Sequence, residues 1–287
     1  MRVTTYNIQY CRGRDGLYDV QRIVAALAGA DLIGLQEVER YWDRSGSIDQ
    51  AAQIAAGLPG YDWAYGPTVE FRTVTDGRSD APPRPRRQFG NMILSRWPLL
   101  QVRRHLLPKH REPSGRVAIQ RGVVEAVVET PVGPLRVLST HLDHLGTPAR
   151  LSQIDMIMTL QSNVTDVGCV STGTETDPEW RALWGETVSI AEPPATALLM
   201  GDFNATPDSP EMVRLLGGEP AMFTDTWPLG GEGGGHDATF YLDWDNRAGK
   251  RIDYCLATPD LARRVERAWV DRDAIGSDHQ PLSVTFR

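Results

Sequence analysis

Short apolar and β-branched runs recur along the chain and predict strands. They cover residues 2–8, 31–36, 90–95, 121–128, 135–140, 196–200, 252–257 and 281–286. Several runs follow one another with no helical pattern between them, and no internal repeat is present. A regular βαβ fold is therefore disfavoured. We expect two packed mixed sheets flanked by helices.

Three segments carry helix signals. The first follows Asp19, a residue type that caps helix N-termini, and repeats apolar residues at helical spacing as far as Leu27. The second begins at residues 147–148 and the third at residues 209–211, each with a proline near the predicted first turn. These helices fall between predicted strands, so each is expected to cover a sheet face.

Three other segments, residues 73–88, 163–194 and 230–235, are predicted to be irregular. None has the character of a linker between two cores, so a single domain over residues 1–287 is predicted. Arginines gather in and beside the first segment: Arg72, Arg78, Arg84, Arg86 and Arg87. They form either a positive lip for a polyanionic substrate or a solvated loop.

Four tryptophans lie in or near irregular segments: Trp180, Trp184, Trp227 and Trp244. They would either form an apolar wall beside a site or pack at the edge of the core. The sequence does not decide between the two.

Composition excludes several classes of protein. With 41% hydrophobic and 23% charged residues the chain is an ordinary globular one. Its three cysteines are widely spaced, which predicts neither a disulfide framework nor a zinc site. A net charge of −7 disfavours an extended nucleic-acid surface. No transmembrane segment or signal segment is apparent, so a cytoplasmic protein is expected.

Polar residues end several of the predicted strands, where buried strands would not favour them. They are Asn7, Glu37, His141, the pair Asp202 and Asn204, and the pair Asp278 and His279. Each alone has a structural explanation, such as turn formation at Asp202. If these strand ends meet at one edge, they form a cluster of carboxylate, amide and imidazole groups. Such a cluster is what a metal-assisted hydrolase requires.

These residue types suit phosphoryl transfer. Mg²⁺ prefers oxygen ligands, which Glu37, Asp278 and Asn7 can supply. Asp202 and Asn204 can orient or deprotonate an attacking water.

The remaining groups suit the phosphate itself. His141 and His279 can bind its oxygens, whether as cations or as neutral hydrogen-bonding rings. A buried Asp253 can fix the tautomer of one of these rings.

Seven motifs in order along residues 5–279 resemble those of the endonuclease/exonuclease/phosphatase superfamily, which includes DNase I-like nucleases. They are Thr5-Tyr6-Asn7, Leu35-Gln36-Glu37-Val38, Gly90-Asn91-Met92-Ile93-Leu94-Ser95-Arg96, Ser139-Thr140-His141-Leu142, Gly201-Asp202-Phe203-Asn204, Arg251-Ile252-Asp253-Tyr254 and Ser277-Asp278-His279. The resemblance implies a four-layer α/β/β/α sandwich. It also implies a phosphoesterase that uses Mg²⁺, with Mn²⁺ as a substitute.

The resemblance assigns roles as well. Glu37 would be the principal metal ligand, helped by Asn7 and Asp278. Asp202 with Asn204 would activate water, and Asp253 would support His279 at the scissile phosphate. His141 would bind the phosphate or assist the leaving group, and the phosphate contacts would come from Asn7, Asn204 and Arg121. The alternative for Arg121 is an exposed strand charge.

Two positions depart from one branch of the superfamily. Gln9 stands where the abasic-site endonucleases have an aspartate that supports the metal site, which leaves the number of ligands open. His141 stands where those enzymes place a tyrosine. An abasic-site repair function is therefore disfavoured.

Three functions stay open at this point. The favoured one is a phosphodiesterase acting on a lipid headgroup or another small diester. A nuclease is the second, and a binding module that kept the fold without turnover is the third.

Overall fold

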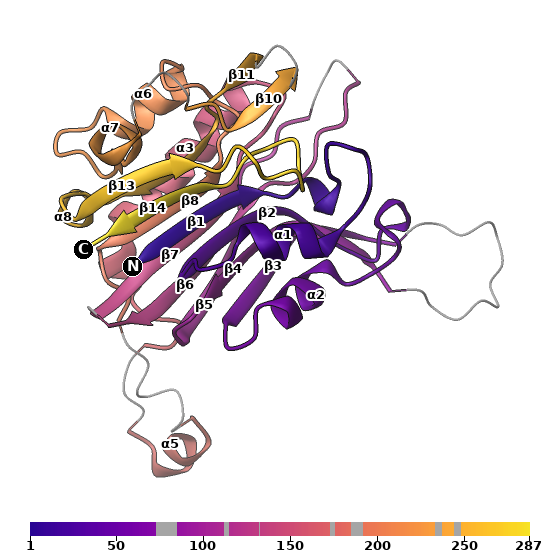
Figure 1. The fold of residues 1–287 in the computed structure, drawn as a ribbon. Coiled ribbons are helices and arrows are strands. Elements are labelled where there is room, and N and C mark those ends of the chain that lie inside the picture. Colours follow the sequence, from indigo (N-terminus) through magenta and orange to yellow (C-terminus); the bar gives the residue numbers. More distant parts are fainter. Residues whose placement is uncertain are drawn as a thin grey trace, which may run out of the picture.

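The computed structural model describes residues 1–72, 85–111, 115–131, 133–172, 176–184, 192–232, 237–243 and 248–287. Two six-stranded sheets dominate it (Figure 1). The first contains, in spatial order, β13 (Val265–Val270), β14 (Leu282–Phe286), β1 (Arg2–Asn7), β2 (Leu32–Arg40), β4 (Arg87–Ser95) and β3 (Asp62–Phe71). The second contains β5 (Leu99–Leu106), β6 (Gly122–Thr130), β7 (Gly133–His141), β8 (Ala197–Asp202), β12 (Asp253–Ala257) and β9 (Thr224–Asp225).

Three apolar clusters divide the molecule into layers. One lies between the two sheets and includes Val3, Ile93, Val124 and Leu198. A second joins the outer face of the first sheet to α1 (Val20–Ala26) and α2 (Gln50–Gly57). A third joins the outer face of the second sheet to α3 (Thr147–Ser162) and α6 (Pro210–Leu216). The predicted four-layer α/β/β/α sandwich is confirmed, and Figure 1 shows α1 and α2 lying across the first sheet.

All three predicted helices are present with the expected N-termini. Asp19 accepts a hydrogen bond from Gln21 N and caps α1, and Ser209 caps α6 in the same way. Pro148 lies in the first turn of α3. The other helical segments are short: α4 (Val164–Val167), α5 (Pro178–Trp184), α7 (Trp227–Gly230), α8 (Pro259–Ala262) and the 3₁₀ turns η1 (Gln9–Cys11) and η2 (Asp43–Ser45).

Several elements differ from the sequence prediction. The segment 163–194, predicted to be irregular, contains α4 and α5. The predicted second strand was too short, because β2 continues to Arg40. Six strands and one longer helix lacked a recognised signal: β3, β5, β9, β13, the pair β10 (Phe240–Asp243) and β11 (Ala248–Lys250), and α2. Among the described residues, no helix has the length and apolarity needed to cross a membrane.

Strand direction brings the polar strand ends to one edge. β1 and β2 are parallel with Asn7 opposite Gln36, and β7 and β8 are parallel with His141 opposite Asp202. β12 is antiparallel to β8 and starts at Asp253, opposite Asp202. β14 is antiparallel to β1, so the residues just before it, including His279, lie at the same edge. Residues from both sheets therefore meet there.

Candidate active site

Glu37 lies at a β-bulge within β2. The pairing of β2 with β4 shifts register between Leu35 and Val38, and Glu37 has a φ of +59°. A bulge re-aims a side chain, and a left-handed φ is costly for a residue other than glycine. The side chain is one-fifth exposed, at 20%. The strand thus bends to present this carboxylate at the edge, rather than ending there as predicted.

Asp202 closes β8, and the residues around it fix its position. A Cβ on Gly201 would lie 1.9 Å from the carbonyl oxygen of Thr140, so only glycine lets β8 approach β7 this closely. The backbone nitrogen of Asn204 donates to Asp202 Oδ1 at 2.8 Å. Asn204 has a φ of +49°, a strained conformation that turns the chain sharply after the strand.

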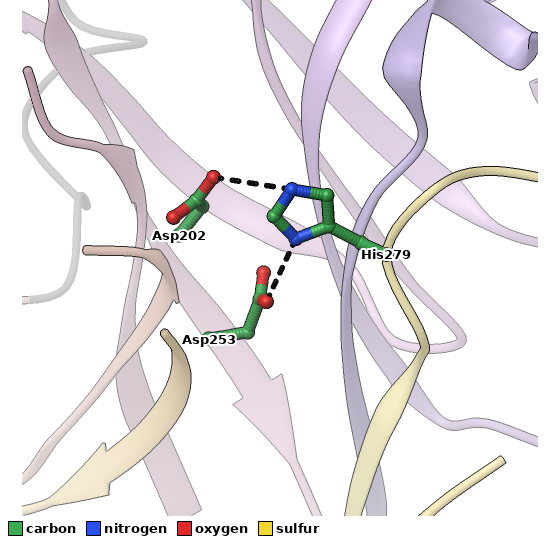
Figure 2. A group of neighbouring side chains, drawn as sticks. All are labelled: Asp202, Asp253 and His279. Atoms are coloured by element: carbon green, nitrogen blue, oxygen red, sulfur yellow. Dashed lines mark hydrogen bonds and ion pairs between the residues drawn. The ribbon is translucent and has the colours of Figure 1, made fainter. Parts of the chain in front are cut away.

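Asp202, Asp253 and His279 converge from β8, β12 and the segment before β14 (Figure 2). His279 Nδ1 lies 2.8 Å from Asp253 Oδ2, and Nε2 lies 3.7 Å from Asp202 Oδ2. All three side chains are buried. The imidazole therefore stands between two carboxylates, one behind it and one beside the cavity.

Burial and charge set the protonation of this group. Burial alone would lower the pKa of His279, but the carboxylates of Asp253 and Asp202 outweigh it and raise that pKa to about 10. Burial, and then repulsion from Asp253, raises the pKa of Asp202 to about 6. At neutral pH the structure therefore holds an imidazolium beside an ionised carboxylate that accepts protons more readily than an ordinary aspartate.

His141 lies close by but has the opposite character. Burial and the neighbouring cations Arg121 and His279 lower the pKa of His141 well below its usual value. Asn204 Nδ2 lies 3.0 Å from His141 Nε2 and donates to the carbonyl of Leu142 at 3.1 Å. His141 is thus a neutral ring oriented by Asn204, whereas His279 is a cation.

Asn7 connects the two sheets. Its Nδ2 donates to Asp202 Oδ2 at 2.9 Å and to Glu37 Oε1 at 3.4 Å, and its Oδ1 accepts from the backbone nitrogen of Gln9 at 3.1 Å. The amide nitrogen rather than the oxygen faces the carboxylates. Ligation of a cation by Asn7 therefore requires its amide to turn over.

Asp278 is bound to Gln9. Gln9 Nε2 donates to Asp278 Oδ2 at 2.7 Å, and Ser277 Oγ donates to Asp278 Oδ1 at 3.3 Å. Gln9 thus contacts both Asn7 and Asp278, two of the three predicted metal ligands. The sequence identified Gln9 as a departure, but this double contact required coordinates.

Arg121 precedes β6 and is buried, with 4% of its surface exposed. The alternative of an exposed strand charge is therefore wrong. Its Nη2 lies 3.1 Å from His144 Nδ1, while its buried Nε and Nη1 have no hydrogen-bond partner among the described residues. Two donors are left for a ligand.

These groups line a cavity of about 400 Å³. Glu37, Arg121, His141, Asp202, Asn204 and His279 contribute to it. The sequence did not identify the other lining residues, which include Tyr10, Trp42, Arg44, Val69, Phe89, Val117 and Ile119. Those residues come from loops and strand faces, which carry no polar strand-end signal.

Two further expectations concern the surroundings of the cavity. Among the described residues, the tryptophan that lines the cavity is Trp42, not Trp180 or Trp227, so of the two alternatives left open for those two the apolar wall is wrong. Trp227 packs against the core between the sheets, and Trp180 is exposed. Trp244 and the side chain of Trp184 lie outside the described part of the chain.

In the arginine-rich segment, Arg78 and Arg84 also fall outside the described ranges. Arg86 pairs with Glu70 at 2.7 Å, and Arg87 pairs with Asp43. These two charges are therefore already compensated.

The donor set fits a hard divalent cation. Glu37 and Asp278 offer carboxylate oxygens, as Mg²⁺ and similar ions prefer. Burial, with repulsion from Asp278 and Asp202, raises the pKa of Glu37 to about 7 even though Arg121 and His279 oppose the shift. Four carboxylates, those of Glu37, Asp202, Asp253 and Asp278, lie there with two cations, Arg121 and His279, so the edge carries more carboxylate groups than cations. A second group, Asp202, Asp253 and His279, also brings carboxylate and imidazole ligand atoms within 4.8 Å of one another.

Solved structures share this fold. An endonuclease/exonuclease/phosphatase from Beutenbergia cavernae is 23% identical with a TM-score of 0.70, and the match covers 99% of this chain and 70% of that one. A mannosyl-6-phosphatase from Bacteroides thetaiotaomicron is 19% identical with a TM-score of 0.65, and the match covers 100% of this chain and 99% of that one. A 3′-5′ exonuclease from Neisseria meningitidis is 18% identical with a TM-score of 0.55, and the match covers 100% of this chain and 99% of that one. No curated protein matches the chain.

The family comparison covers nearly the whole chain. A model of the Endonuclease/Exonuclease/phosphatase family matches residues 4–279. That range begins in β1 and ends at His279, so it contains all the residues of the edge described above. The chain belongs to the endonuclease/exonuclease/phosphatase family of phosphoric ester hydrolases.

Proposed function

We propose that the protein is a Mg²⁺-dependent phosphodiesterase that hydrolyses a small diester, such as a lipid headgroup, by direct attack of water. The observation that carries the proposal is the line of Asp253, His279 and Asp202. It combines a fixed imidazolium with a carboxylate whose pKa is about 6. A general base with a pKa just below neutral is ionised at working pH and still accepts a proton.

Asp202 takes the proton of the attacking water. Its Oδ1 is held by the Asn204 backbone, so the other oxygen, Oδ2, is the one shared with Asn7 and His279. The residues that line the cavity include no serine, threonine or cysteine among the described residues. Water is therefore the nucleophile that this site best supports.

His279 stabilises negative charge on the phosphoryl oxygens. Its Nδ1 proton is held by Asp253, which leaves the Nε2 proton for a ligand or for Asp202. A fixed donor in a water-poor site contributes more than the same donor in water. Arg121, with two unpartnered donor nitrogens, contacts the same phosphate. Contacts from Asn7 and Asn204 would require each amide to release a present partner, because Asn7 Nδ2 donates to Asp202 and Glu37, and Asn204 Nδ2 donates to Leu142 and faces His141.

Glu37, Asp278 and Asn7 are the proposed ligands of Mg²⁺, with Mn²⁺ as a substitute. When bound, the cation would neutralise charge on a nonbridging oxygen of the phosphate. His141, neutral and oriented by Asn204, donates from Nδ1 to the phosphate or the leaving group.

The choice of a small diester rests on charge and on the shape of the site. A net charge of −7 opposes binding to a long polyanion, and the cavity volume of about 400 Å³ is in the range of small-ligand sites. The relatives named above as a mannosyl-6-phosphatase and an exonuclease make phosphomonoesters and DNA necessary competitors in any test. The single domain and the cytoplasmic location stay predictions.

The test is a substrate panel with Mg²⁺, Mn²⁺ or EDTA. It contains bis-p-nitrophenyl phosphate, sphingomyelin, inositol phosphates, mannose 6-phosphate and plasmid DNA. We expect metal-dependent cleavage of a diester, and plasmid nicking without small-diester cleavage would make the protein a nuclease. Absence of turnover on every member with metal bound would support a binding module instead.

A further inference from the structure

Arg44 lines the cavity but has no role in the proposed reaction. It belongs to η2, just after β2, and lines the same cavity as Glu37 and Arg121. Its Nε donates to Glu39 Oε1 at 2.9 Å, and its Nη2 pairs with the same oxygen. Ser45 Oγ donates to Glu39 Oε2 at 2.8 Å. The Glu39 side chain is fully buried, so it anchors one side of the guanidinium firmly.

Aromatic rings fix the guanidinium further. Its carbon lies 3.9 Å from the ring centroid of Tyr10 and 4.7 Å from that of Trp42. The rings of Tyr18 and Tyr10 stack with 6.0 Å between their centroids, and the rings of Phe71 and Trp42 pack edge to face with 5.3 Å between theirs. Arg44 is thus attached to a rigid ring assembly that spans two loops and the end of a strand.

The backbone that carries Tyr10 is strained. Gln9, Tyr10 and Cys11 have φ values of +42°, +46° and +64°, and none is glycine. Such runs persist only where the surroundings hold them, and they gather at functional sites. Gln50 Nε2 donates to the carbonyl of Tyr10 at 2.7 Å and holds this turn in place. This strained turn carries the Tyr10 ring that contacts the Arg44 guanidinium.

The remaining nitrogen of Arg44 is available. Nη1 has no hydrogen-bond partner among the described residues, and 41% of the side chain is exposed. The cavity therefore has a guanidinium at Arg44, a second at Arg121 and an apolar lining that includes Val69, Phe89, Val117 and Ile119. Arg44 in η2 and Arg121 beside β6 thus place two guanidinium groups in one cavity, together with apolar side chains that can contact the carbon framework of a ligand.

We propose that Arg44 binds a second anionic group, a phosphate or carboxylate, on the part of the substrate that does not carry the scissile phosphoester. The inference rests on the proposed function, since it takes the Asp202 and His279 centre as the place of hydrolysis. A preorganised guanidinium that retains a free N–H is well suited to an anionic oxygen. The substrate class is a small phosphoester with two anionic groups joined by a short carbon framework.

The competing explanation is that Arg44 only neutralises the buried Glu39. The double variant Glu39→Gln with Arg44→Gln separates the two, because it removes both charges and leaves no buried carboxylate unpaired. Arg214→Gln is the matched control, since Arg214 pairs with Asp155 at 3.0 Å on the far helices α6 and α3. Circular dichroism of each variant establishes that it is folded.

The experiment measures equilibrium binding, so it does not depend on turnover. Isothermal titration calorimetry with Mg²⁺ present compares benzylphosphonate with 4-carboxybenzylphosphonate, which differ by one carboxylate and cannot be hydrolysed. We expect the carboxylate to improve binding about tenfold in the wild type and in Arg214→Gln. The preference should disappear in Arg44→Gln and in the double variant.

Equal binding of the two phosphonates to the wild type would overturn the inference, as would a preference that survives both Arg44 variants. Binding of a short single-stranded oligonucleotide that depends on Arg44, without a preference between the phosphonates, would overturn the assignment to a small substrate. A protein that shows the preference but hydrolyses no phosphoester would contradict the proposed function alone.

Discussion

Two of the buried networks of charged residues in the described part of the chain differ in their balance of charge. On the outer face of the second sheet, beneath α3, Glu125 lies 2.7 Å from His105 and 3.1 Å from Arg136. Burial would raise the pKa of Glu125, but those two partners outweigh it and lower that pKa. Each charge there has a partner, as expected of a network that supports the fold.

The active-site edge has the opposite balance. Glu37, Asp202, Asp253 and Asp278 gather around His279 and Arg121, and the pKa values of Glu37 and Asp202 are raised to about 7 and about 6. Burial alone therefore does not distinguish a structural network from a catalytic one. What distinguishes them is charge left uncompensated for a ligand.

The largest predicted effect is on kcat, which should fall when the active-site network is changed and stay the same when the other network is changed. Asp202→Ala and His279→Ala should each lower kcat by roughly 10³-fold or more, because each removes a group that acts on the reacting phosphate or water. His105→Ala, the matched histidine variant in the other network, should retain kcat. Steady-state kinetics with bis-p-nitrophenyl phosphate measures this. Near-normal activity in His279→Ala would refute the role of that imidazole.

The next effect is on the free energy of unfolding, to which the network around Glu125 contributes. Glu125→Ala leaves the fully buried Arg136 without its carboxylate and should cost about 3–5 kcal/mol of unfolding free energy. Because the folded pKa of Glu125 is lowered, its contribution is present above the unfolded pKa and is lost as pH falls through the folded value. Urea unfolding of both proteins at neutral and acid pH measures this. An unchanged midpoint would show that the balanced network contributes little.

A smaller effect concerns the supporting carboxylate of the active-site edge. Asp253→Asn should lower activity roughly 10²-fold and move the alkaline limb of the kcat/KM profile from near pH 10 to lower pH, because Asp253 is the largest contributor that raises the pKa of His279. The acid limb, near pH 6 from Asp202, should remain. A pH profile from 5 to 11 provides the measurement. An alkaline limb that does not move would contradict the pairing.

The smallest predicted effect is a gain in stability. Burial raises the pKa of Asp202, so ionised Asp202 destabilises the fold above about pH 6, and Asp202→Asn should remove part of that cost. His279 loses a partner at the same time, which reduces the gain. We expect Tm to rise by roughly 2–4 °C without divalent cation. A fall in Tm at pH 8 would mean that the carboxylate is compensated after all.

Much of the fold could be predicted, since its central strands are short buried runs and the helices α1 and α6 have clear caps at Asp19 and Ser209. The other strands were missed for physical reasons. β3 contains Gly66 and Pro67 and is largely exposed at both ends, and β13 carries two adjacent charged residues, Glu266 and Arg267, at a sheet edge. The helix α2 follows the cap Asp49, so a capping residue for this helix is present in the sequence.

The candidate site was predictable where polar residues end buried strands, as at Asn7, His141 and Asp202. The backbone strain and the burial of residues in the site could not be predicted. The bulge at Glu37 and the burial of Arg121 depend on strand pairing, which one sequence does not specify. Arg44 takes its position from Glu39 and Tyr10, one of which is distant in sequence, so no local pattern marked it.

The central claim is that the uncompensated carboxylates of the active-site edge hold a divalent cation. Isothermal titration of Mg²⁺ into the wild type, Glu37→Gln and Glu125→Gln tests it without any substrate. We expect the wild type and Glu125→Gln to bind Mg²⁺ with similar affinity, and Glu37→Gln to bind at least ~10-fold more weakly. No binding to the wild type, or equal binding to Glu37→Gln, would contradict the account.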